Sequence, residues 1–246
     1  MKNLCVLGAG IKSIAHLTIE SVEFLKNADV VLGLLNEPIA KDFIKSKAKK
    51  FIDLENIYYS DEVRYKAYAN IAEYIVEQTE YYDNVCVIFY GHPMYCVTPS
   101  IEAINQAMKK NINIISCPAV SSLDCLLSDL YIDPLENGMQ IYTADDLISN
   151  KITIDNNIDQ VIMQIGFINH EKHVHLSKNE NLDNLKSKLL DFYHGETVCF
   201  IYEASLYSNC LPIINKQTIA SIEKNSVSTL STLFIPKSTS KCFEWL

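Results

Sequence analysis

The sequence predicts an α/β protein whose first half folds around a mainly parallel sheet. Short apolar runs of strand length alternate with amphipathic stretches of helix length, a pattern typical of βα units. Glycine-containing loops follow two of the apolar runs, at the strand ends where open parallel sheets bind ligands. With 246 residues, 48% of them hydrophobic, the chain is long enough to bury one large core or two smaller ones.

The expected elements form two series along the chain. In the first series, strands are expected at 4–7, 30–35, 85–90 and 112–116, and helices at 14–27, 40–48 and 100–110. In the second series, strands are expected at 139–142, 161–165, 198–202 and 233–235, and a helix at 182–192. A Cys-Pro-Ala-Val-Ser-Ser segment at 117–122 separates the two series and leads into an apolar helix at 123–130. We therefore predict two domains, residues 1–117 and 118–246.

Composition and charge exclude several classes of protein. The net charge is −9 and the basic residues form no long block, so nucleic acid is not an expected partner. The first residues lead directly into a strand rather than a signal peptide, and no apolar run approaches the roughly 20 residues of a membrane span. We expect a soluble cytoplasmic protein with no membrane association. The 8 cysteines form no C-x-x-C pair and are expected to be reduced thiols.

The first expected strand ends in Gly8-Ala9-Gly10, where glycine allows a sharp bend and close approach of a ligand or another segment. A dinucleotide-binding fingerprint would need a third glycine at position 13, which is Ser13. No acidic residue closes the following expected strand at 30–35 either. The sequence therefore disfavours NAD, and it contains no P-loop lysine pattern.

A second loop, Tyr90-Gly91-His92-Pro93-Met94-Tyr95, follows the expected strand at 85–90. A glycine and a proline at the carboxyl end of a parallel strand predict a rigid loop in the ligand-binding crevice of the sheet. The alternative is a turn that ends the strand, with His92 capping a helix, and the spacing alone does not decide between the two.

Arg64 is the only arginine in a chain that otherwise uses lysine. A helix start near residue 60 would put Arg64 and Tyr68, four residues apart, on one helical face, with Tyr58 just before the helix. Lysine cannot replace the planar five-donor fork of a guanidinium, which favours a functional role for Arg64. The alternatives are a surface ion pair with Asp61 and stacking on Tyr65.

A histidine-rich segment contains His170, Glu171, His173 and His175. Their spacing is not the i, i+4 spacing of metal ligands on a helix, and the segment is polar. We interpret it as a solvated hairpin and expect no metal site.

These motifs, in this order, resemble the tetrapyrrole (corrin and porphyrin) methylase superfamily, also called class III S-adenosylmethionine methyltransferases, over nearly the whole chain. Family members carry a glycine-rich first loop, a Gly-Asp-Pro loop after the fourth strand and a Pro-Gly-Val-Ser-Ser segment. The corresponding segments here are 8–10, 91–93 and 118–122. The resemblance implies two α/β domains with S-adenosylmethionine in the cleft between them.

One branch of the superfamily fits more closely. The histidine of Tyr-Gly-His-Pro and the Asp-Leu…Tyr…Arg…Tyr segment resemble the borosin peptide-backbone α-N-methyltransferases. Other matching segments are 121–126, 129–130, 132–134, 142–144, 164–166 and 231–236.

The resemblance implies catalytic roles for Tyr58, Arg64 and Tyr68. Glu55 stands where some relatives have a further catalytic tyrosine, so the sequence departs from a four-residue site. The family position near Glu203 usually holds a small residue, which is a second departure. The implied cofactor contacts are Gly8, Gly10, Tyr90, His92, Tyr95, Ser121, Ser122, Gln164, Glu203, Ser231 and Thr232.

The activity implied is S-adenosylmethionine-dependent methylation of backbone amides in a ribosomally made precursor peptide, with S-adenosylhomocysteine as product. Fused relatives continue into a substrate tail, whereas this sequence stops at Leu246, so we expect a separate precursor chain. The expected assembly is a homodimer, or a heterotetramer with two precursor chains. We expect the Arg64 guanidinium to lower the pKa of Tyr58 or Tyr68, so that one acts as general base, while Arg64 donates to the amide oxygen.

Two alternatives remain open at this stage. A tetrapyrrole C-methyltransferase would act on a precorrin- or uroporphyrinogen-like substrate, although His92 and the tyrosine-rich segment argue against it. The second alternative is a catalytically silent module that has the same fold and binds peptides.

Overall fold

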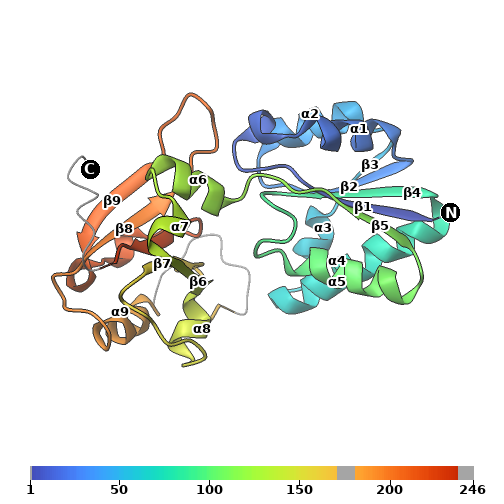
Figure 1. The fold of residues 1–246 in the computed structure, drawn as a ribbon. Helices are drawn as coiled ribbons and strands as arrows, with labels where there is room; N and C mark the ends of the chain where they lie inside the picture. The colour runs from blue at the N-terminus through green and yellow to red at the C-terminus, as the bar shows by residue number, and fades with distance from the viewer. Residues whose placement is uncertain (1, 171–180, 238–246) are drawn as a thin grey trace. The chain divides into compact units, whose positions relative to one another are not determined.

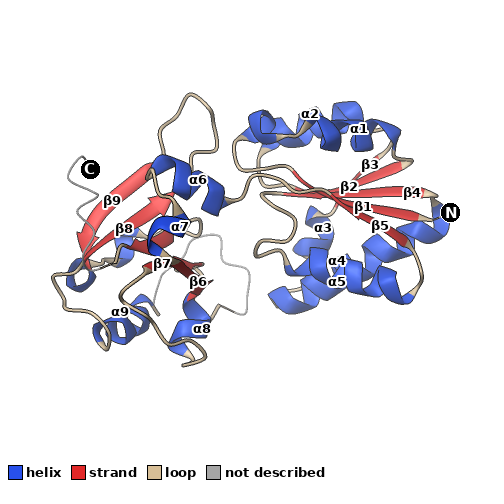
Figure 2. Ribbon diagram, in the orientation of Figure 1, coloured by secondary structure: helices blue, strands red, loops and turns tan. Residues whose placement is uncertain are grey.

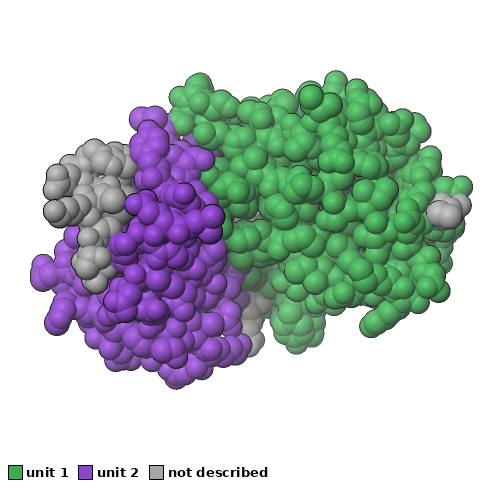
Figure 3. Space-filling view, in the orientation of Figure 1, with its two compact units in different colours: residues 1–125, 171–173, 206–210 green, residues 126–170, 174–205, 211–246 purple. Residues whose placement is uncertain are grey.

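The computed structural model describes residues 2–170 and 181–237. These residues form two compact units (Figure 3). Unit 1 comprises residues 2–125 and Leu206–Cys210, and unit 2 comprises Leu126–His170, 181–205 and 211–237. The first unit thus extends past the predicted limit at residue 117 and includes a short segment from later in the chain. The domain limits of 1–117 and 118–246 stay a prediction.

Unit 1 contains a five-stranded sheet in the order β3-β2-β4-β1-β5 (Figure 1). Its strands are β1 (Asn3–Gly8), β2 (Val30–Leu34), β3 (Phe51–Asp53), β4 (Asn84–Phe89) and β5 (Asn113–Ser116). Every pairing in this sheet is parallel, as the alternation of strands and helices predicts.

Helices cover both faces of this sheet (Figure 2). One face carries α1 (Ile19–Asn27) and α2 (Pro38–Lys47), and the other carries α3 (Glu55–Tyr58), α4 (Arg64–Tyr81) and α5 (Thr98–Lys109). Because helices lie on both sides, the central strands are buried except at one end residue each, which explains why they read as apolar runs.

Two helix starts differ from the expected ones. The helix expected from residue 14 begins only at Ile19, because Thr18 caps it by accepting a hydrogen bond from the Ser21 N–H. The helix expected from Ser60 begins at Arg64. Val63 is the N-cap residue of α4, and the Ser60 hydroxyl instead donates to the Ile57 carbonyl.

Unit 2 contains a second sheet, in the order β6-β7-β10-β8-β9. Its strands are β6 (Met139–Thr143), β7 (Asp159–Met163), β8 (Val198–Glu203), β9 (Ile213–Thr218) and β10 (Thr232–Ile235). Only β6 and β7 pair in parallel, and the other pairings in the described part of this sheet are antiparallel. Its helices are α7 (Pro134–Asn137), α8 (Ala144–Ile148) and α9 (Leu182–Leu190), while α6 (Ser122–Asp129) contains the division between the units.

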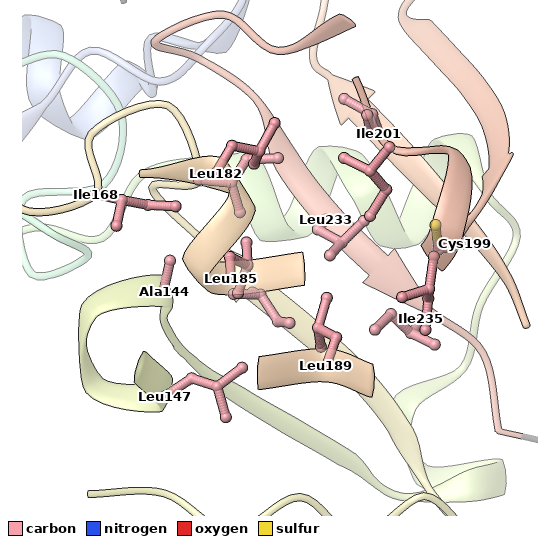
Figure 4. Close-up of a cluster of buried hydrophobic side chains, with 14 of the residues drawn as sticks. Ala144, Leu147, Ile168, Leu182, Leu185, Leu189, Cys199, Ile201, Leu233 and Ile235 are labelled. Carbon is pink, nitrogen blue, oxygen red and sulfur yellow. The ribbon is translucent and has the colours of Figure 1, made fainter. Parts of the chain in front are cut away.

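The core of unit 2 lies between one face of this sheet and helices α8 and α9 (Figure 4). Leu185 and Leu189 of α9 face Leu233 and Ile235 of β10, with Ile201 of β8 beside them. β10 is flanked by β7 and β8, so Leu233 lies near the middle of this apolar layer.

None of the helices in the described residues combines the length and the apolar character that crossing a membrane requires. Each cysteine in residues 2–170 and 181–237 is a free thiol, and Cys242 lies outside them.

We predict that Leu233→Ala destabilises the protein by about 2–5 kcal/mol, because it removes buried methyl groups and leaves a cavity in the centre of the unit 2 core. Urea unfolding followed by circular dichroism measures this change. The matched control is Leu211→Ala, since Leu211 is 89% exposed and its loss should shift the free energy of unfolding by less than about 0.5 kcal/mol. Equal effects of the two substitutions would contradict this description of the core.

Candidate active site

Two loops of unit 1 meet at the carboxyl ends of β1 and β4. The Gly10 N–H donates to the Gly91 carbonyl over 3.2 Å, and the Gly91 N–H donates to the Gly10 carbonyl over 3.0 Å. Both glycines have a positive φ, 72° and 74° respectively, which side-chain-bearing residues rarely adopt. This pair of hydrogen bonds fixes the two glycine loops to each other.

Gly8 has no room for a side chain. A Cβ atom there would lie 2.3 Å from the Gly91 carbonyl oxygen, 2.6 Å from the Ala119 Cβ and 2.8 Å from the Pro93 Cδ. Three segments that are far apart in sequence therefore converge on Gly8. These are the three segments on which the sequence resemblance rests.

His92 organises its own loop. Its Nδ1 accepts a hydrogen bond from the Met94 N–H over 3.0 Å, and its carbonyl accepts one from the Tyr95 N–H over 3.1 Å. The ring thus closes a turn within its own loop. Burial raises the pKa of Tyr90 to about 12, so this phenol is protonated at neutral pH.

The hydroxyl of Tyr95 is buried and has no hydrogen-bond partner among the residues that the structure describes. Burial also raises the pKa of this phenol. A buried hydroxyl without a partner costs free energy, so the atom indicates a site for a polar group of a ligand.

Ser121 begins the segment that leads into α6. Its N–H and its hydroxyl both donate to Asp124 Oδ2, over 2.7 and 2.6 Å, and its Oγ accepts from the Asp124 N–H over 3.1 Å. The Ser121 hydroxyl proton is thus already engaged in a reciprocal cap, and Ser122 is the first residue of α6.

The four predicted cofactor residues in unit 2 gather at one end of its three central strands, β7, β10 and β8. Ser231 Oγ donates to Glu203 Oε1 over 2.5 Å and accepts from the Ser228 N–H over 2.8 Å. Thr232 is buried and its hydroxyl lies 3.8 Å from the Met163 sulfur, at the end of β7.

Gln164 follows Met163 directly and has a φ of 60°, an uncommon conformation for a residue with a side chain. The turn it begins is tightly packed, because a Cβ at Gly166 would lie 2.0 Å from the Ser228 carbonyl oxygen. This packing places Gln164 beside the segment that carries Ser231.

A third group consists of one arginine and two tyrosines in unit 1. The Arg64 Nε–H donates to Tyr68 Oη over 3.2 Å, and the guanidinium carbon lies 5.8 Å from the centre of the Tyr68 ring. The ring of Tyr58, from α3, stacks against that of Tyr68 with 6.1 Å between centres and 29° between planes. Helical spacing alone predicts the Arg64–Tyr68 contact, whereas the position of Tyr58 depends on the packing of α3 against α4.

The pKa of Tyr58 differs from the expectation. Burial raises it, the neighbouring Tyr68 raises it further through charge interaction and a side-chain hydrogen bond, and Arg64 opposes these effects without reversing them. Tyr58 is therefore a protonated phenol at neutral pH: the guanidinium lowers its pKa as expected, but burial and Tyr68 outweigh that effect. The reason is that the sequence reveals the guanidinium but not the burial.

Glu55, which replaces the further tyrosine of some relatives, forms an ion pair with Lys41. Lys41 Nζ lies 2.8 Å from Glu55 Oε2 and 2.9 Å from Asp53 Oδ2. Burial alone would lower the pKa of Lys41, but the two carboxylates raise it overall. Glu55 thus helps to join α3 to α2.

Two residues that hold the first glycine loop were not predicted. His16 Nδ1 accepts from the N–H groups of Ile11 and Lys12, over 3.3 and 3.1 Å. Gly10 also packs against it, since a Cβ at Gly10 would lie 2.2 Å from the His16 Cβ. The only signal in the sequence is a histidine six positions after a glycine, which many proteins share.

Glu37 is the second such residue. Its buried carboxylate caps α2 by accepting from the N–H groups of Ile39 and Ala40, and it also accepts from the hydroxyls of Ser13 and Tyr207. Burial alone would raise its pKa, but these hydrogen bonds lower it overall. With its oxygens engaged in this way, Glu37 has a structural role. The Glu-Pro pair at the start of the helix is the sequence signal that predicts its role as a cap.

No three His, Cys, Asp or Glu side chains in the described part of the chain are grouped so as to hold a metal ion. His170 lies in a turn at the end of that part, and Glu171, His173 and His175 lie outside it.

Curated relatives share this chain's sequence over almost its full length. A borosin cyclic peptide precursor of Cerrena unicolor, a type I methyltransferase/precursor protein, is 30% identical over 95% of this chain and 58% of its own. A type II protein of Phlebiopsis gigantea is 29% identical over 96% of this chain and 43% of its own. The methyltransferase/precursor of omphalotin A from Omphalotus olearius is 27% identical over 97% of this chain and 58% of its own. The chain therefore spans about half the length of these relatives.

Solved structures share the fold at lower identity. Uroporphyrin-III C-methyltransferase of Thermus thermophilus, complexed with S-adenosylhomocysteine, superposes with a TM-score of 0.66 at 13% identity, over 96% of this chain and 97% of its own. The precorrin-6Y methylase of Archaeoglobus fulgidus gives a TM-score of 0.59 at 16% identity, over 96% of this chain and 98% of its own. The predicted fold class is confirmed by these likenesses.

The family model of the Tetrapyrrole (Corrin/Porphyrin) Methylases matches residues 3–208. That range contains both glycine loops, the arginine–tyrosine group and the segment from 118 to 122. The predicted resemblance is confirmed, and the chain belongs to the tetrapyrrole methylase family.

Proposed function

We propose that this protein is an S-adenosylmethionine-dependent methyltransferase that methylates backbone amide nitrogens of a peptide carried on a separate chain. The observation that carries the proposal is the contact of Arg64 with Tyr68 and of Tyr68 with Tyr58. The relatives whose names include a borosin peptide precursor support a peptide as substrate.

The residues of unit 1 fit the proposed cofactor in two respects. The Tyr95 hydroxyl is a buried polar atom that lacks a partner in the described part of the chain, and the contacts at Gly8 bring the two glycine loops and the segment with Ser121 and Ser122 together. When bound, S-adenosylmethionine supplies a methyl group activated by a sulfonium. The residues that would hold it in unit 1 are Gly8, Gly10, Tyr90, His92, Tyr95, Ser121 and Ser122, and those in unit 2 are Gln164, Glu203, Ser231 and Thr232.

The arginine–tyrosine group fits the chemical need of an amide. An amide nitrogen is a poor nucleophile because its lone pair is delocalised into the carbonyl. Arg64 would donate to the amide oxygen, where negative charge accumulates as the nitrogen loses its proton. Tyr58, which is protonated, would act as a second donor, and Tyr68, which accepts the guanidinium hydrogen bond, is assigned as the base that would take the amide proton in its phenolate form and become a phenol.

The direct test uses S-adenosylmethionine and three synthetic peptides in which valine, phenylalanine or serine alternates with glycine. Because the peptides are added as separate molecules, the test also examines a substrate in trans. We expect tandem mass spectrometry to show the mass of one methylene on backbone fragments. Methylation of side chains only, or methylation of uroporphyrinogen III and of no peptide, would overturn the proposal.

Arg64→Lys should lower the rate of peptide methylation by on the order of 100-fold, because lysine keeps the charge but loses the fork that reaches both Tyr68 and a substrate oxygen. Binding of S-adenosylmethionine, measured by calorimetry, should persist in the variant. The matched control is Lys66→Gln, which alters an exposed charge in the first turns of the same helix and should leave the rate unchanged. A fully active Arg64→Lys enzyme would remove Arg64 from the mechanism, and the absence of turnover in the wild type would favour a silent binding module.

Tyr58→Phe should lower the rate by roughly tenfold, the effect of losing one hydrogen bond to a developing charge. Since its pKa is raised above the usual value of about 10, Tyr58 is protonated at every pH from about 7 to about 10. The ratio of wild-type to variant rates should therefore be constant over that range. A ratio that increases with pH would identify Tyr58 as a base that ionises in this range, contrary to the assignment.

Gly8→Ala should weaken binding of S-adenosylmethionine by roughly tenfold or more, because overpacking typically costs about 1–3 kcal/mol and here the new methyl group meets the loop at Gly91. Calorimetry on the folded variant measures the dissociation constant. The matched control is Gly195→Ala, where the nearest atom to a new Cβ is 3.1 Å away and belongs to the Ala220 side chain. Unchanged affinity in Gly8→Ala would separate the glycine loops from the cofactor site.

A further inference from the structure

Two exposed tyrosines adjoin the arginine–tyrosine group and have no role in the proposed chemistry. Tyr59 is 49% exposed and Tyr65 is 64% exposed. The centre of the Tyr59 ring lies 4.9 Å from that of Tyr58, with the planes at 78°, an edge-to-face contact. We call Tyr59 and Tyr65 the aromatic rim.

Helical geometry places Tyr65 beside the same group. Tyr65 and Tyr68 are three residues apart on α4, and residues at this spacing are neighbours on a helix surface. Tyr59 thus adjoins the group through its contact with Tyr58, and Tyr65 adjoins it by its spacing from Tyr68 on the helix.

A single exposed aromatic ring on a protein surface is ordinary. Here, however, the Tyr59 ring contacts Tyr58, and Tyr65 is three residues from Tyr68 on the same helix, so each exposed ring adjoins one of the two phenols of the arginine–tyrosine group. Tyrosine rings offer a large apolar face at a small cost in side-chain entropy, which is why they are enriched where proteins bind peptides and other proteins.

An extended peptide brings its neighbouring side chains to such rings. Successive Cα atoms are 3.8 Å apart, so an amide at Arg64 has flanking side chains within a few ångströms on alternate sides of the backbone. The rings of Tyr58 and Tyr68, beside which we place this amide, have their centres 6.1 Å apart.

We infer that the aromatic rim selects the substrate sequence by binding apolar or aromatic side chains next to the methylated amide. The inference rests on the proposed function and adds a specificity to it. Contact with a valine or phenylalanine side chain buries apolar surface that serine does not offer. The rim residues affect which peptide is bound, while the proton transfer is assigned to the arginine–tyrosine group.

The experiment measures kcat and KM for the three alternating peptides with the wild type, Tyr59→Ala and Tyr65→Ala. We expect the wild type to prefer the valine and phenylalanine peptides over the serine peptide in kcat/KM. Each alanine variant should reduce that preference by roughly three- to tenfold through KM, the range expected for the loss of one aromatic contact. Tyr59→Phe and Tyr65→Phe should keep the preference because the apolar ring remains.

The matched control is Tyr81→Ala, which removes a 68% exposed tyrosine from the last residue of the same helix. Its peptide preference should equal that of the wild type. Binding of S-adenosylmethionine, measured by calorimetry, should be the same in all variants, since a general loss of structure would weaken it.

The outcomes separate the inference from the function it rests on. If the wild type methylates backbone amides but shows no preference among the three peptides, or if the alanine variants keep the preference, the inference is overturned and the proposed function stands. If the wild type methylates no backbone amide in any peptide, both are overturned.

Discussion

The close approach of the two glycine loops is the constraint on which the rest of the unit 1 site depends. Gly10 and Gly91 exchange backbone hydrogen bonds, and Gly8 lies so close to the Gly91 carbonyl and to Ala119 that no side chain fits. The loop after β4 therefore has a fixed position relative to β1, and His92 closes that loop from within. Tyr90 and Tyr95 belong to the same loop, so the position of both phenols follows from backbone contacts at glycines.

Much of the fold of unit 1 could be predicted because its strands are buried on both faces and therefore appear as apolar runs. Strands β3 and β9 were missed for a physical reason. β3 has only three residues, and β9 lies at the edge of its sheet, where polar side chains such as Asn215 and Lys216 are tolerated. The antiparallel pairing in unit 2 was not predicted either, because apolar strand runs do not reveal strand direction.

The site was predictable where it depends on local geometry and not where it depends on burial. Arg64 and Tyr68 are four residues apart on one helix, so their contact follows from helical spacing. The raised pKa of Tyr58 follows from its burial between α3 and α4, which the sequence does not show. Glu37 gathers donors from three separate segments, and no spacing along the chain predicts that arrangement.

The guanidinium of Arg64 allows one side chain to serve two purposes in the proposed site. An ammonium group at position 64 would be a point charge that satisfies one acceptor well. The guanidinium directs its Nε–H at Tyr68 and carries its further donors on the terminal nitrogens, so one side chain can orient a base and stabilise an anion at once. Burial keeps the proton on Tyr58 although the neighbouring guanidinium opposes this. A protonated phenol and a guanidinium would stabilise the negative charge on the amide oxygen, and the phenolate form of the second tyrosine would take the proton from the nitrogen as it becomes a nucleophile.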